Sequence, residues 1–208
     1  LNAGAVAGVT TVQSPIALAR AVMEQSPHVM LASKGAELFA RELGVPEVSP
    51  VYFETERRKR ALESYKTRKQ AGVEPRVDYK FGTVGVVVLD SKGNLVAGTS
   101  TGGMTGKRWG RIGDSPVIGA GTYADNRSCA VSATGHGEYF IRHTVARDIC
   151  ARMQFAGQSL QEAAETVITD ELVAAGGDGG VVAVDASGEV SMVFNTPGMY
   201  RASVSGSG

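Results

Sequence analysis

The stretch from Gly82 to Asp90 constrains the fold of this chain more than any other feature. A polar, charged segment ends at Lys80, and Gly82 and Thr83 then open a run of mostly β-branched residues that continues to Leu89. Such a run predicts a β-strand, because β-branched side chains pack well on a pleated sheet. Thr83 therefore stands at the first position of a strand that the chain enters from a polar linker.

A hydroxyl at this position suits a nucleophile that is exposed when the chain is cut in front of it. Threonine is a weak nucleophile, but a free α-amine on the same residue supplies a general base with an unperturbed pKa near ~7.7–8.0. The Gly82–Thr83 pair alone does not establish this chemistry, because glycine before a β-branched residue is also an ordinary way to begin a strand.

Two apolar runs on either side of Lys92-Gly93-Asn94 predict a β-hairpin with strands at 84–90 and 95–101. In such a hairpin, the start of the first strand lies near the end of the second. We therefore expect Thr83 and Thr101 to face each other, within reach of a hydroxyl–hydroxyl hydrogen bond.

A turn-rich segment after this hairpin contains Arg111 and Asp114. The planar guanidinium of Arg111 matches a carboxylate, and the carboxylate of Asp114 can accept from an ammonium group. Together the two side chains are suited to hold both ends of an α-amino acid. The alternative is a local ion pair between them on a loop, which is common and contributes little to stability.

Thr134 and Gly135 follow a short apolar strand and precede a helical pattern. A hydroxyl and backbone N–H groups at a glycine turn can form an oxyanion hole. The alternative is a helix N-cap made by Thr134, with Glu138 nearby in the first turn. One turn can serve both purposes.

Four ordered strings link these residues to a known family: GTVGVVVLD, TSTGGMTGKRWGRIGDSPVIGAGTYADN, SATGHGEYFIR and FNTPGMYR. They closely resemble the isoaspartyl peptidases and plant-type L-asparaginases, which are threonine-type N-terminal-nucleophile hydrolases. The resemblance spans nearly the whole chain except a linker at about 65–81. Glycosylasparaginases share a similar Arg-x-Gly-Asp-Ser-Pro string, but they usually carry Asp before the nucleophile, where this chain has Gly82.

The resemblance implies a four-layer αββα sandwich of the N-terminal-nucleophile hydrolase type, incomplete at both ends in this chain. Residues 1–208 would form a single domain. Self-cleavage between Gly82 and Thr83 would divide it into an α-subunit part, 1–82, and a β-subunit part, 83–208. The family assembles as a dimer of αβ heterodimers. Its structural monovalent cation is bound by a loop that this chain lacks, so no cofactor or metal is expected.

The resemblance also implies roles for the residues at the scissile bond. The Thr83 hydroxyl would attack the carbonyl of Gly82 during self-cleavage, and the same hydroxyl would later attack the substrate. Thr101 would orient or polarise Thr83. The hydroxyl of Thr134 and the N–H of Gly135 would form the oxyanion hole and so contact the substrate.

The remaining implied roles concern substrate binding. Arg111 would hold the α-carboxylate and Asp114 the α-ammonium, and a backbone group of Gly137 would add to this grip. L-Asparagine and β-aspartyl dipeptides share these two groups and differ only in the leaving group. The alternatives are a glycosylasparaginase-like hydrolase, and a non-catalytic, aspartate-binding relic or arrested precursor.

The amino-acid composition limits the classes of partner and the cellular compartment that we expect. Lys plus Arg and Asp plus Glu both number 21, so bulk charge indicates no nucleic-acid partner. No apolar run is long enough for a membrane helix. Cys129 and Cys150 have neither metal nor redox spacing and are interpreted as buried free thiols. A reducing compartment fits them, so we expect the cytoplasm, with the periplasm left open.

The apolar periodicity elsewhere predicts the remaining elements. Helices are expected at 14–23, 35–42, 55–65, 138–155 and 159–175. Strands are expected at 5–9, 180–185, 190–194 and about 199–204, with a short apolar stretch at 29–31.

Overall fold

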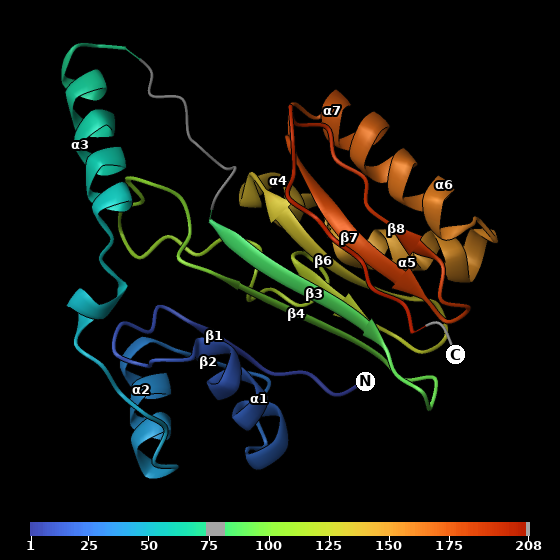
Figure 1. The fold of residues 1–208 in the computed structure, drawn as a ribbon, viewed down its shortest axis with the longest axis horizontal. Helices are drawn as coiled ribbons and strands as arrows, with labels where there is room; N and C mark the ends of the chain where they lie inside the picture. The colour runs from blue at the N-terminus through green and yellow to red at the C-terminus, as the bar shows by residue number, and fades with distance from the viewer. Residues whose placement is uncertain (74–81, 207–208) are drawn as a thin grey trace. The chain divides into compact units, whose positions relative to one another are not determined.

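The computed structural model describes residues 1–73 and 82–206, which form two compact units (Figure 1). We call the first the β-rich unit; it comprises Leu1, Thr83–Thr101 and Gly113–Gly208. The second, the α-rich unit, comprises Asn2–Gly82 and Gly102–Ile112. Both units contain helices and strands, so the chain is a mixed α/β protein.

A four-stranded antiparallel sheet in the order β5-β6-β7-β8 forms the centre of the β-rich unit. Its strands are β5 (Thr122–Ala124), β6 (Cys129–Gly135), β7 (Gly179–Asp185) and β8 (Val190–Ser191). Most residues of β6 and β7 are buried irrespective of the face they point to. Both faces of this sheet must therefore be covered.

The predicted hairpin covers one face of this sheet. Strands β3 (Thr83–Leu89) and β4 (Leu95–Thr101) pair antiparallel, with Thr83 opposite Thr101. The Asp90 carboxylate accepts hydrogen bonds of 2.8 Å from the backbone N–H groups of Lys92 and Asn94, the two ends of the turn. The prediction of a hairpin is confirmed, and the side-chain bonds in its turn help to explain the register.

The hairpin and the four-stranded sheet share a small apolar core. Leu95, Ala130 and Val184 are buried in it, and partly buried side chains of β3, β4 and β5 pack around them: Val87, Leu89, Ala97 and Ala124. Side chains of a strand alternate between its two faces. The intervening residues Val84, Val86 and Val88 accordingly point away from the sheet and are exposed.

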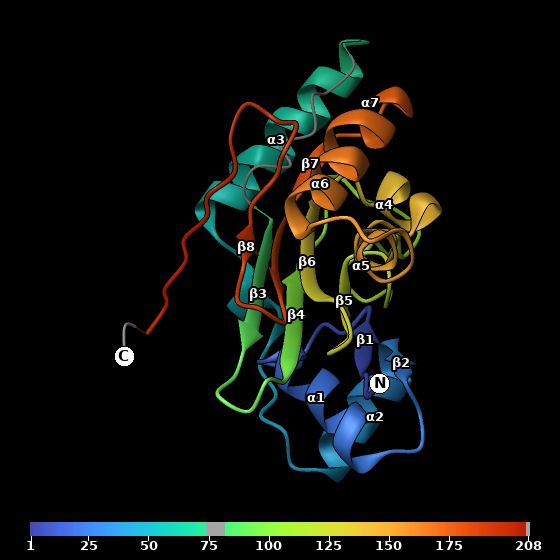
Figure 2. The ribbon, with the colours of Figure 1, turned by 90° about the vertical axis from the view of Figure 1, so that its right-hand side faces the viewer.

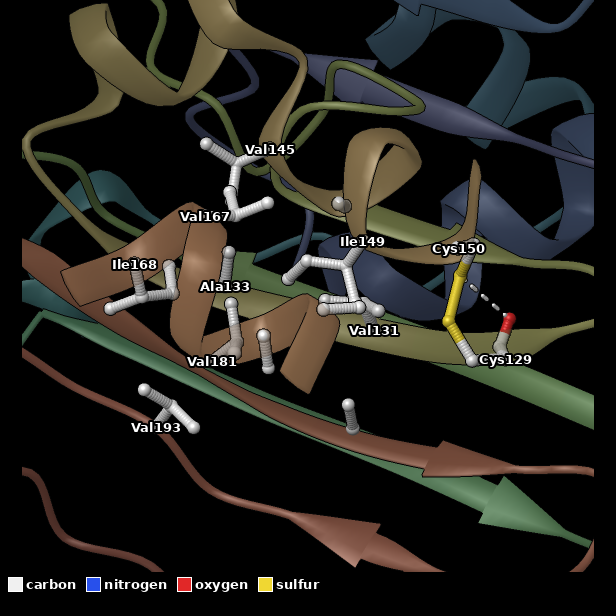
Figure 3. Close-up of a cluster of buried hydrophobic side chains, with 14 of the residues drawn as sticks. Cys129, Val131, Ala133, Val145, Ile149, Cys150, Val167, Ile168, Val181 and Val193 are labelled. Atoms are coloured by element: carbon white, nitrogen blue, oxygen red, sulfur yellow. Dashed lines mark hydrogen bonds between the residues drawn. A yellow bond between two sulfur atoms is a disulfide. The ribbon is translucent and has the colours of Figure 1, made fainter. Parts of the chain in front are cut away.

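Helices cover the other face of the sheet (Figure 2). They are α4 (Gly137–His143), α5 (Val145–Ala156), α6 (Leu160–Glu165), a π-helical segment (Thr166–Glu171) and α7 (Leu172–Ala174). Figure 3 shows Val131 and Val181 of the sheet in one cluster with Ile149 of α5. Each fully buried side chain of this size contributes about 1.5–3 kcal/mol to folding.

The single helix predicted over 138–155 is divided by Thr144, which has a left-handed backbone (φ 47°). The break allows the first backbone N–H groups of α5 to find hydrogen-bond partners outside the helix. There the backbone N–H groups of Ala146 and Arg147 donate to the carbonyls of Ala120 and Gly119, at 3.1 and 2.8 Å. Helix-terminal N–H groups lack partners within their own helix. The loop carbonyls satisfy two of them.

A disulfide joins Cys129, the first residue of β6, to Cys150 of α5 (Figure 3). Their Cα atoms are 5.4 Å apart although 21 positions separate them in sequence. The prediction of free thiols was therefore wrong. Packing of α5 on β6 brings the two side chains together, and neither spacing nor composition reveals that contact.

The predicted strand at 180–185 is confirmed as β7, but the strands predicted at 190–194 and about 199–204 are largely wrong. β8 ends at Ser191, and only an isolated bridge between Gly180 and Phe194 continues the pairing. No strand occurs between residue 195 and residue 206, the end of the described chain. The Thr196-Pro197-Gly198 sequence explains the break, because proline has no N–H to donate and glycine favours turns.

The α-rich unit contains the parallel pair β1 (Ala5–Ala7) and β2 (Met30–Ala32), and the helices α1 (Pro15–Gln25), α2 (Ser33–Glu42) and α3 (Glu56–Gln70), with a 3-10 turn at Pro50–Phe53. Its core is Val12, Leu18, Ala36 and Ala40. α3 continues beyond the predicted end at Tyr65, because Lys66–Gln70 are mostly good helix formers with basic residues near the carboxy terminus. The rest of the predicted linker, 74–81, lies outside the described residues.

None of the helices in the described part of the chain combines the length and apolar character needed to cross a bilayer.

Candidate active site

The hydroxyls of Thr83 and Thr101 meet at the open end of the hairpin. Thr83 Oγ1 donates a 3.2 Å hydrogen bond to Thr101 Oγ1, and both residues are half-buried. The contact follows directly from the register that pairs the first residue of β3 with the last of β4. The expected geometry is therefore confirmed, while the roles assigned to the two residues stay predictions.

Thr134 and Gly135 form the end of β6, one position before His136, which begins the approach to α4. The alternative in which Thr134 caps a helix is wrong, because the N-cap position belongs to His136. A Cβ on Gly135 would lie 2.3 Å from the carbonyl oxygen of Asp178, so only glycine fits. Gly135 is thus the last strand residue before the chain enters α4 through His136.

The two sheets bring these hydroxyls to the same end of the interface between them. A Cβ on Gly85 of β3 would be only 2.1 Å from Ser132 Oγ of β6, so the two strands touch at this level. Thr83 lies two residues beyond Gly85 and Thr134 two residues beyond Ser132, in both cases away from the apolar core. Because strand side chains alternate, both threonines lie on the facing surfaces.

Asp114 is buried (6% exposed) in the same unit. Its backbone packs against Gly121, where a Cβ would lie 2.5 Å from the Asp114 carbonyl. The carbonyl of Gly121 in turn accepts from the backbone N–H of Ala133 at 2.9 Å. The loop of Asp114 is thereby held against the strand that carries Thr134.

The remaining predicted site residues are Gly82, Arg111 and Gly137. Gly137 is buried and begins α4, two residues after Gly135. Gly82 and Arg111 belong to the α-rich unit, where the backbone N–H of Arg111 donates to the carbonyl of Arg108 at 3.0 Å. The role of Arg111 as a substrate clamp, and its alternative as a partner of Asp114, stay predictions.

The imidazole of His136 borders this turn. Its Nε2 atom lies 3.2 Å from a carboxylate oxygen of Glu138, and its ring meets the ring of Tyr139 edge-on at 4.8 Å. These two contacts fix the orientation of the imidazole of His136, the residue that follows Gly135 in the sequence.

Sequence reasoning missed three residues that support the site. The Asn195 side chain accepts from the N–H of Gly179 at 2.8 Å and donates to the carbonyls of Ile168 and Gly177 at 2.9 and 3.2 Å. It thereby holds the segment that faces Gly135. The other two, Thr99 and Ser132, are hydroxyl residues two positions before Thr101 and Thr134, and that spacing was a usable signal.

A pocket of about 500 Å³ in the α-rich unit is lined by α3 and by Gly106–Arg108, and none of the predicted site residues lines it. Among residues 1–73 and 82–206, no group of three or more His, Cys, Asp or Glu side chains is arranged to hold a metal ion.

The fold and site together define a mixed α/β protein in which hydroxyl side chains gather at one end of two packed sheets. The chain belongs to the asparaginase family: a family model described as asparaginase matches residues 1–208. It is 52% identical to an isoaspartyl peptidase of Escherichia coli, over 97% of this chain and 64% of that protein. It thus spans less than two thirds of that relative's length.

Eukaryotic relatives are similar over the same part of the chain. A putative isoaspartyl peptidase/L-asparaginase of Dictyostelium discoideum is 45% identical, over 97% of this chain and 67% of that protein. An isoaspartyl peptidase/L-asparaginase of Mus musculus is 42% identical, over 98% of this chain and 62% of that protein.

Proposed function

We propose that this protein is a self-activating amidohydrolase that converts L-asparagine to L-aspartate and ammonia and removes β-aspartyl residues from isoaspartyl peptides. The observation that supports this best is the 3.2 Å hydrogen bond between the hydroxyls of Thr83 and Thr101, at the first position of a strand. The printed names of the relatives, isoaspartyl peptidase and L-asparaginase, support the substrate class.

Activation would begin with attack of Thr83 Oγ1 on the carbonyl carbon of Gly82. The C–N bond breaks as the acyl group moves to oxygen, and the hydroxyl proton passes to the Thr83 nitrogen, which becomes the free α-amine. Water then hydrolyses the ester and leaves the carboxylate of Gly82 and a free Thr83 hydroxyl. Glycine suits the acyl position because it leaves its carbonyl unshielded and tolerates a strained backbone.

In turnover the same hydroxyl attacks the side-chain carbonyl of asparagine or the β-carbonyl of an isoaspartyl peptide. The Thr83 α-amine accepts the hydroxyl proton and returns it to the leaving nitrogen. The oxyanion would be stabilised by the Thr134 hydroxyl and the Gly135 N–H. Water then hydrolyses the β-aspartyl ester on Thr83. The amine must be neutral to act as base, so activity should rise through an apparent pKa at or below ~7.7–8.0.

Substrate selection would depend on the end that asparagine and β-aspartyl peptides share. Arg111 would bind the α-carboxylate, Asp114 the α-ammonium, and Gly137 would add a backbone contact. Burial of Asp114 supports such a clamp. A buried carboxylate is costly unless a cationic group pairs with it, so the site should strongly favour ligands that carry an ammonium group. An ordinary α-peptide would leave a charged group unpaired, at a cost of roughly ~1–3 kcal/mol or more.

We further propose the complete αββα sandwich and its assembly. In this proposal, the two packed sheets and the helix layer of the β-rich unit would be three of the four layers. The exposed side chains of Val84, Val86 and Val88 form an apolar outer face that a further layer would cover. Residues 1–82 and 83–208 would remain in one domain after cleavage, and two such heterodimers would associate.

The compartment also stays a proposal. The sequence predicted the cytoplasm partly because Cys129 and Cys150 were taken as free thiols, and their disulfide removes that support, since disulfides are rare in the cytosol. Fractionation of the source cells, with immunodetection of the protein, tests the proposal.

The proposed function is tested by self-cleavage of the full-length protein. On a denaturing gel, the wild type should give two pieces, the second beginning at Thr83. Thr83→Ala should give one uncleaved, inactive chain, and Thr83→Ser should retain some cleavage because it keeps a hydroxyl. A new amino terminus at residue 83 in Thr83→Ala would rule out self-cleavage.

Substrate comparison separates the alternatives. Turnover of asparagine and a β-aspartyl dipeptide, without turnover of glycosyl-asparagine, supports the proposal. Preferred turnover of glycosyl-asparagine would indicate a glycosylasparaginase. Aspartate binding with neither cleavage nor turnover would indicate a relic or an arrested precursor.

A further inference from the structure

A second pair of hydroxyls lies one step deeper in the interface between the two sheets. Thr99 of β4 and Ser132 of β6 have their hydroxyl oxygens 2.6 Å apart. Thr99 precedes Thr101 by two residues, and Ser132 precedes Thr134 by two. One step of two strand residues is about 6.8 Å, so this pair lies one side-chain layer below the candidate site.

Each hydroxyl of this pair also has a backbone acceptor within reach. Thr99 Oγ1 lies 3.1 Å from the carbonyl oxygen of Gly121, and Ser132 Oγ lies 3.4 Å from that of Gly98. Either hydroxyl can be the donor in the 2.6 Å contact. Both hydroxyls are thus partnered, as buried polar groups must be if they are not to destabilise the fold.

Gly85 makes this contact possible. It lies opposite Thr99 in the hairpin, and a Cβ at this position would be 2.1 Å from Ser132 Oγ and 3.0 Å from Ser132 Cβ. A side chain there would force Ser132 to move. Gly85, Thr99 and Ser132 therefore join three strands, β3, β4 and β6, at one point.

The surroundings indicate why hydroxyls occur here. Deeper in the same interface the contacts are apolar, through Leu95, Ala130 and Val184. Apolar contacts are non-directional and leave neighbouring sheets free to shift slightly, whereas hydrogen bonds prescribe distance and angle. A directional contact between the sheets is most useful next to residues whose separation matters.

We propose that Thr99 and Ser132 are positioning residues that set the distance between the Thr83 hydroxyl and the oxyanion site at Thr134. This inference rests on the proposed function. Thr99 fixes the position of β4, and thereby that of Thr101 and its partner Thr83. Ser132 fixes the position of β6, which carries Thr134. A misplacement of about 1 Å between reacting groups can lower a rate by about 10²-fold.

The same network reaches the predicted ammonium clamp. The Gly121 carbonyl that accepts from Thr99 also accepts from Ala133, and Gly121 packs on the backbone of Asp114. Loss of the Thr99 hydroxyl should therefore affect both kcat and the KM for asparagine. Loss of the Ser132 hydroxyl should act mainly on kcat.

The first test compares Thr99→Val, Thr99→Ser and Ser132→Ala in the full-length protein, well below the Tm of each variant. Thr99→Val keeps the volume and loses the hydroxyl, so kcat should fall about 10–100-fold. Thr99→Ser keeps the hydroxyl and should recover most of this loss. Thr169→Val is the matched control: it removes an exposed hydroxyl that donates to the backbone carbonyl of Glu165 at 2.7 Å and should leave kcat unchanged.

The second test uses the steric contact and does not depend on the first. Gly85→Ala should lower both Tm and kcat, because its Cβ meets Ser132 Oγ. Ser132→Gly removes both atoms that would clash. The double variant should regain the Tm of Ser132→Gly, but its kcat should remain as low as that of Ser132→Gly, because the hydroxyl is still absent.

The outcomes separate the two proposals. Folded Thr99→Val and Ser132→Ala variants with kcat within twofold of the wild type would overturn the positioning role alone. So would a Gly85→Ala/Ser132→Gly variant with wild-type kcat. A wild-type protein that neither cleaves itself nor turns over either substrate would overturn the proposed function, and the positioning role with it.

Discussion

Gly135 and Gly179 lie opposite each other at the last pair of the β6–β7 ladder, with φ angles of 151° and 153°. L-residues with a side chain rarely adopt this backbone conformation. The ring of Phe140 packs over both glycines, within 2.7 Å of where a Cβ would stand on either. The end of the β6–β7 ladder, next to Thr134, therefore depends on two glycines that are 44 positions apart in sequence.

Gly135→Ala should lower both stability and activity. Its Cβ would lie 2.3 Å from the carbonyl of Asp178, and the strained backbone alone costs about 1–3 kcal/mol. Gly157→Ala is a control with a positive φ of 68° and open space around it. We expect Gly135→Ala to show the larger loss of Tm and a lower kcat at temperatures where it is folded. Equal effects in the two variants would contradict the steric argument.

Thr134→Val should separate stabilisation of the oxyanion from substrate binding. Valine keeps the shape of threonine and loses the hydroxyl donor, so kcat should fall by roughly ~10²–10³. Binding of the product aspartate should change far less, because the proposed carboxylate and ammonium clamps remain. Steady-state kinetics and calorimetric titration with aspartate measure the two effects. An unchanged kcat would remove Thr134 from the oxyanion site.

Arg111→Ala should impair turnover but not maturation. The uncleaved precursor presents no free α-carboxylate, so the clamp has no function in self-cleavage. Loss of a buried, charge-paired contact costs about 2–5 kcal/mol, which lowers kcat/KM for asparagine by orders of magnitude. Arg108→Ala is the control, since the Arg108 guanidinium stacks over Trp109 at 4.5 Å. Near-normal kcat/KM in Arg111→Ala would exclude Arg111 from the site.

Asp125 should make the protein sensitive to acid. A side-chain hydrogen bond from Arg127 is the main cause that lowers the pKa of this buried carboxyl from 3.8 to about 2. Because the pKa is lower in the folded state, the stabilisation is present above pH 3.8 and is lost as the pH falls to about 2. Asp125→Asn should therefore reduce the fall in Tm across this range, and an identical fall in both proteins would contradict the assignment.

The Cys129–Cys150 disulfide should contribute measurably to stability. A bond that closes a loop of this length restricts the unfolded chain and stabilises by about 3 kcal/mol. The Cys129→Ala/Cys150→Ala variant should unfold at lower denaturant concentration, and reduced wild type should behave similarly. Mass analysis after alkylation without reductant should find both cysteines unlabelled. Labelling of both would restore the free thiols that the sequence predicted.

Features that depend on neighbouring residues were predictable from the sequence. The run after Gly82 and the Lys92-Gly93-Asn94 turn determine a hairpin, because turn length and strand length together set the pairing. The contact between Thr83 and Thr101 follows from that register alone. The ordered strings around Arg111, Asp114 and Thr134 likewise indicated the asparaginase family.

Features that depend on packing between distant segments were decided only by the tertiary structure. The disulfide required α5 to lie on β6, and the break at Thr144 required loop carbonyls at Gly119 and Ala120. The contact of Ser132 with Gly85 exists because two sheets stack face to face, an arrangement that strand patterns alone do not specify. The sequence thus determined which hydroxyls are available, and the stacking of the sheets determined that those of Thr83, Thr101 and Thr134 lie at one end of the interface.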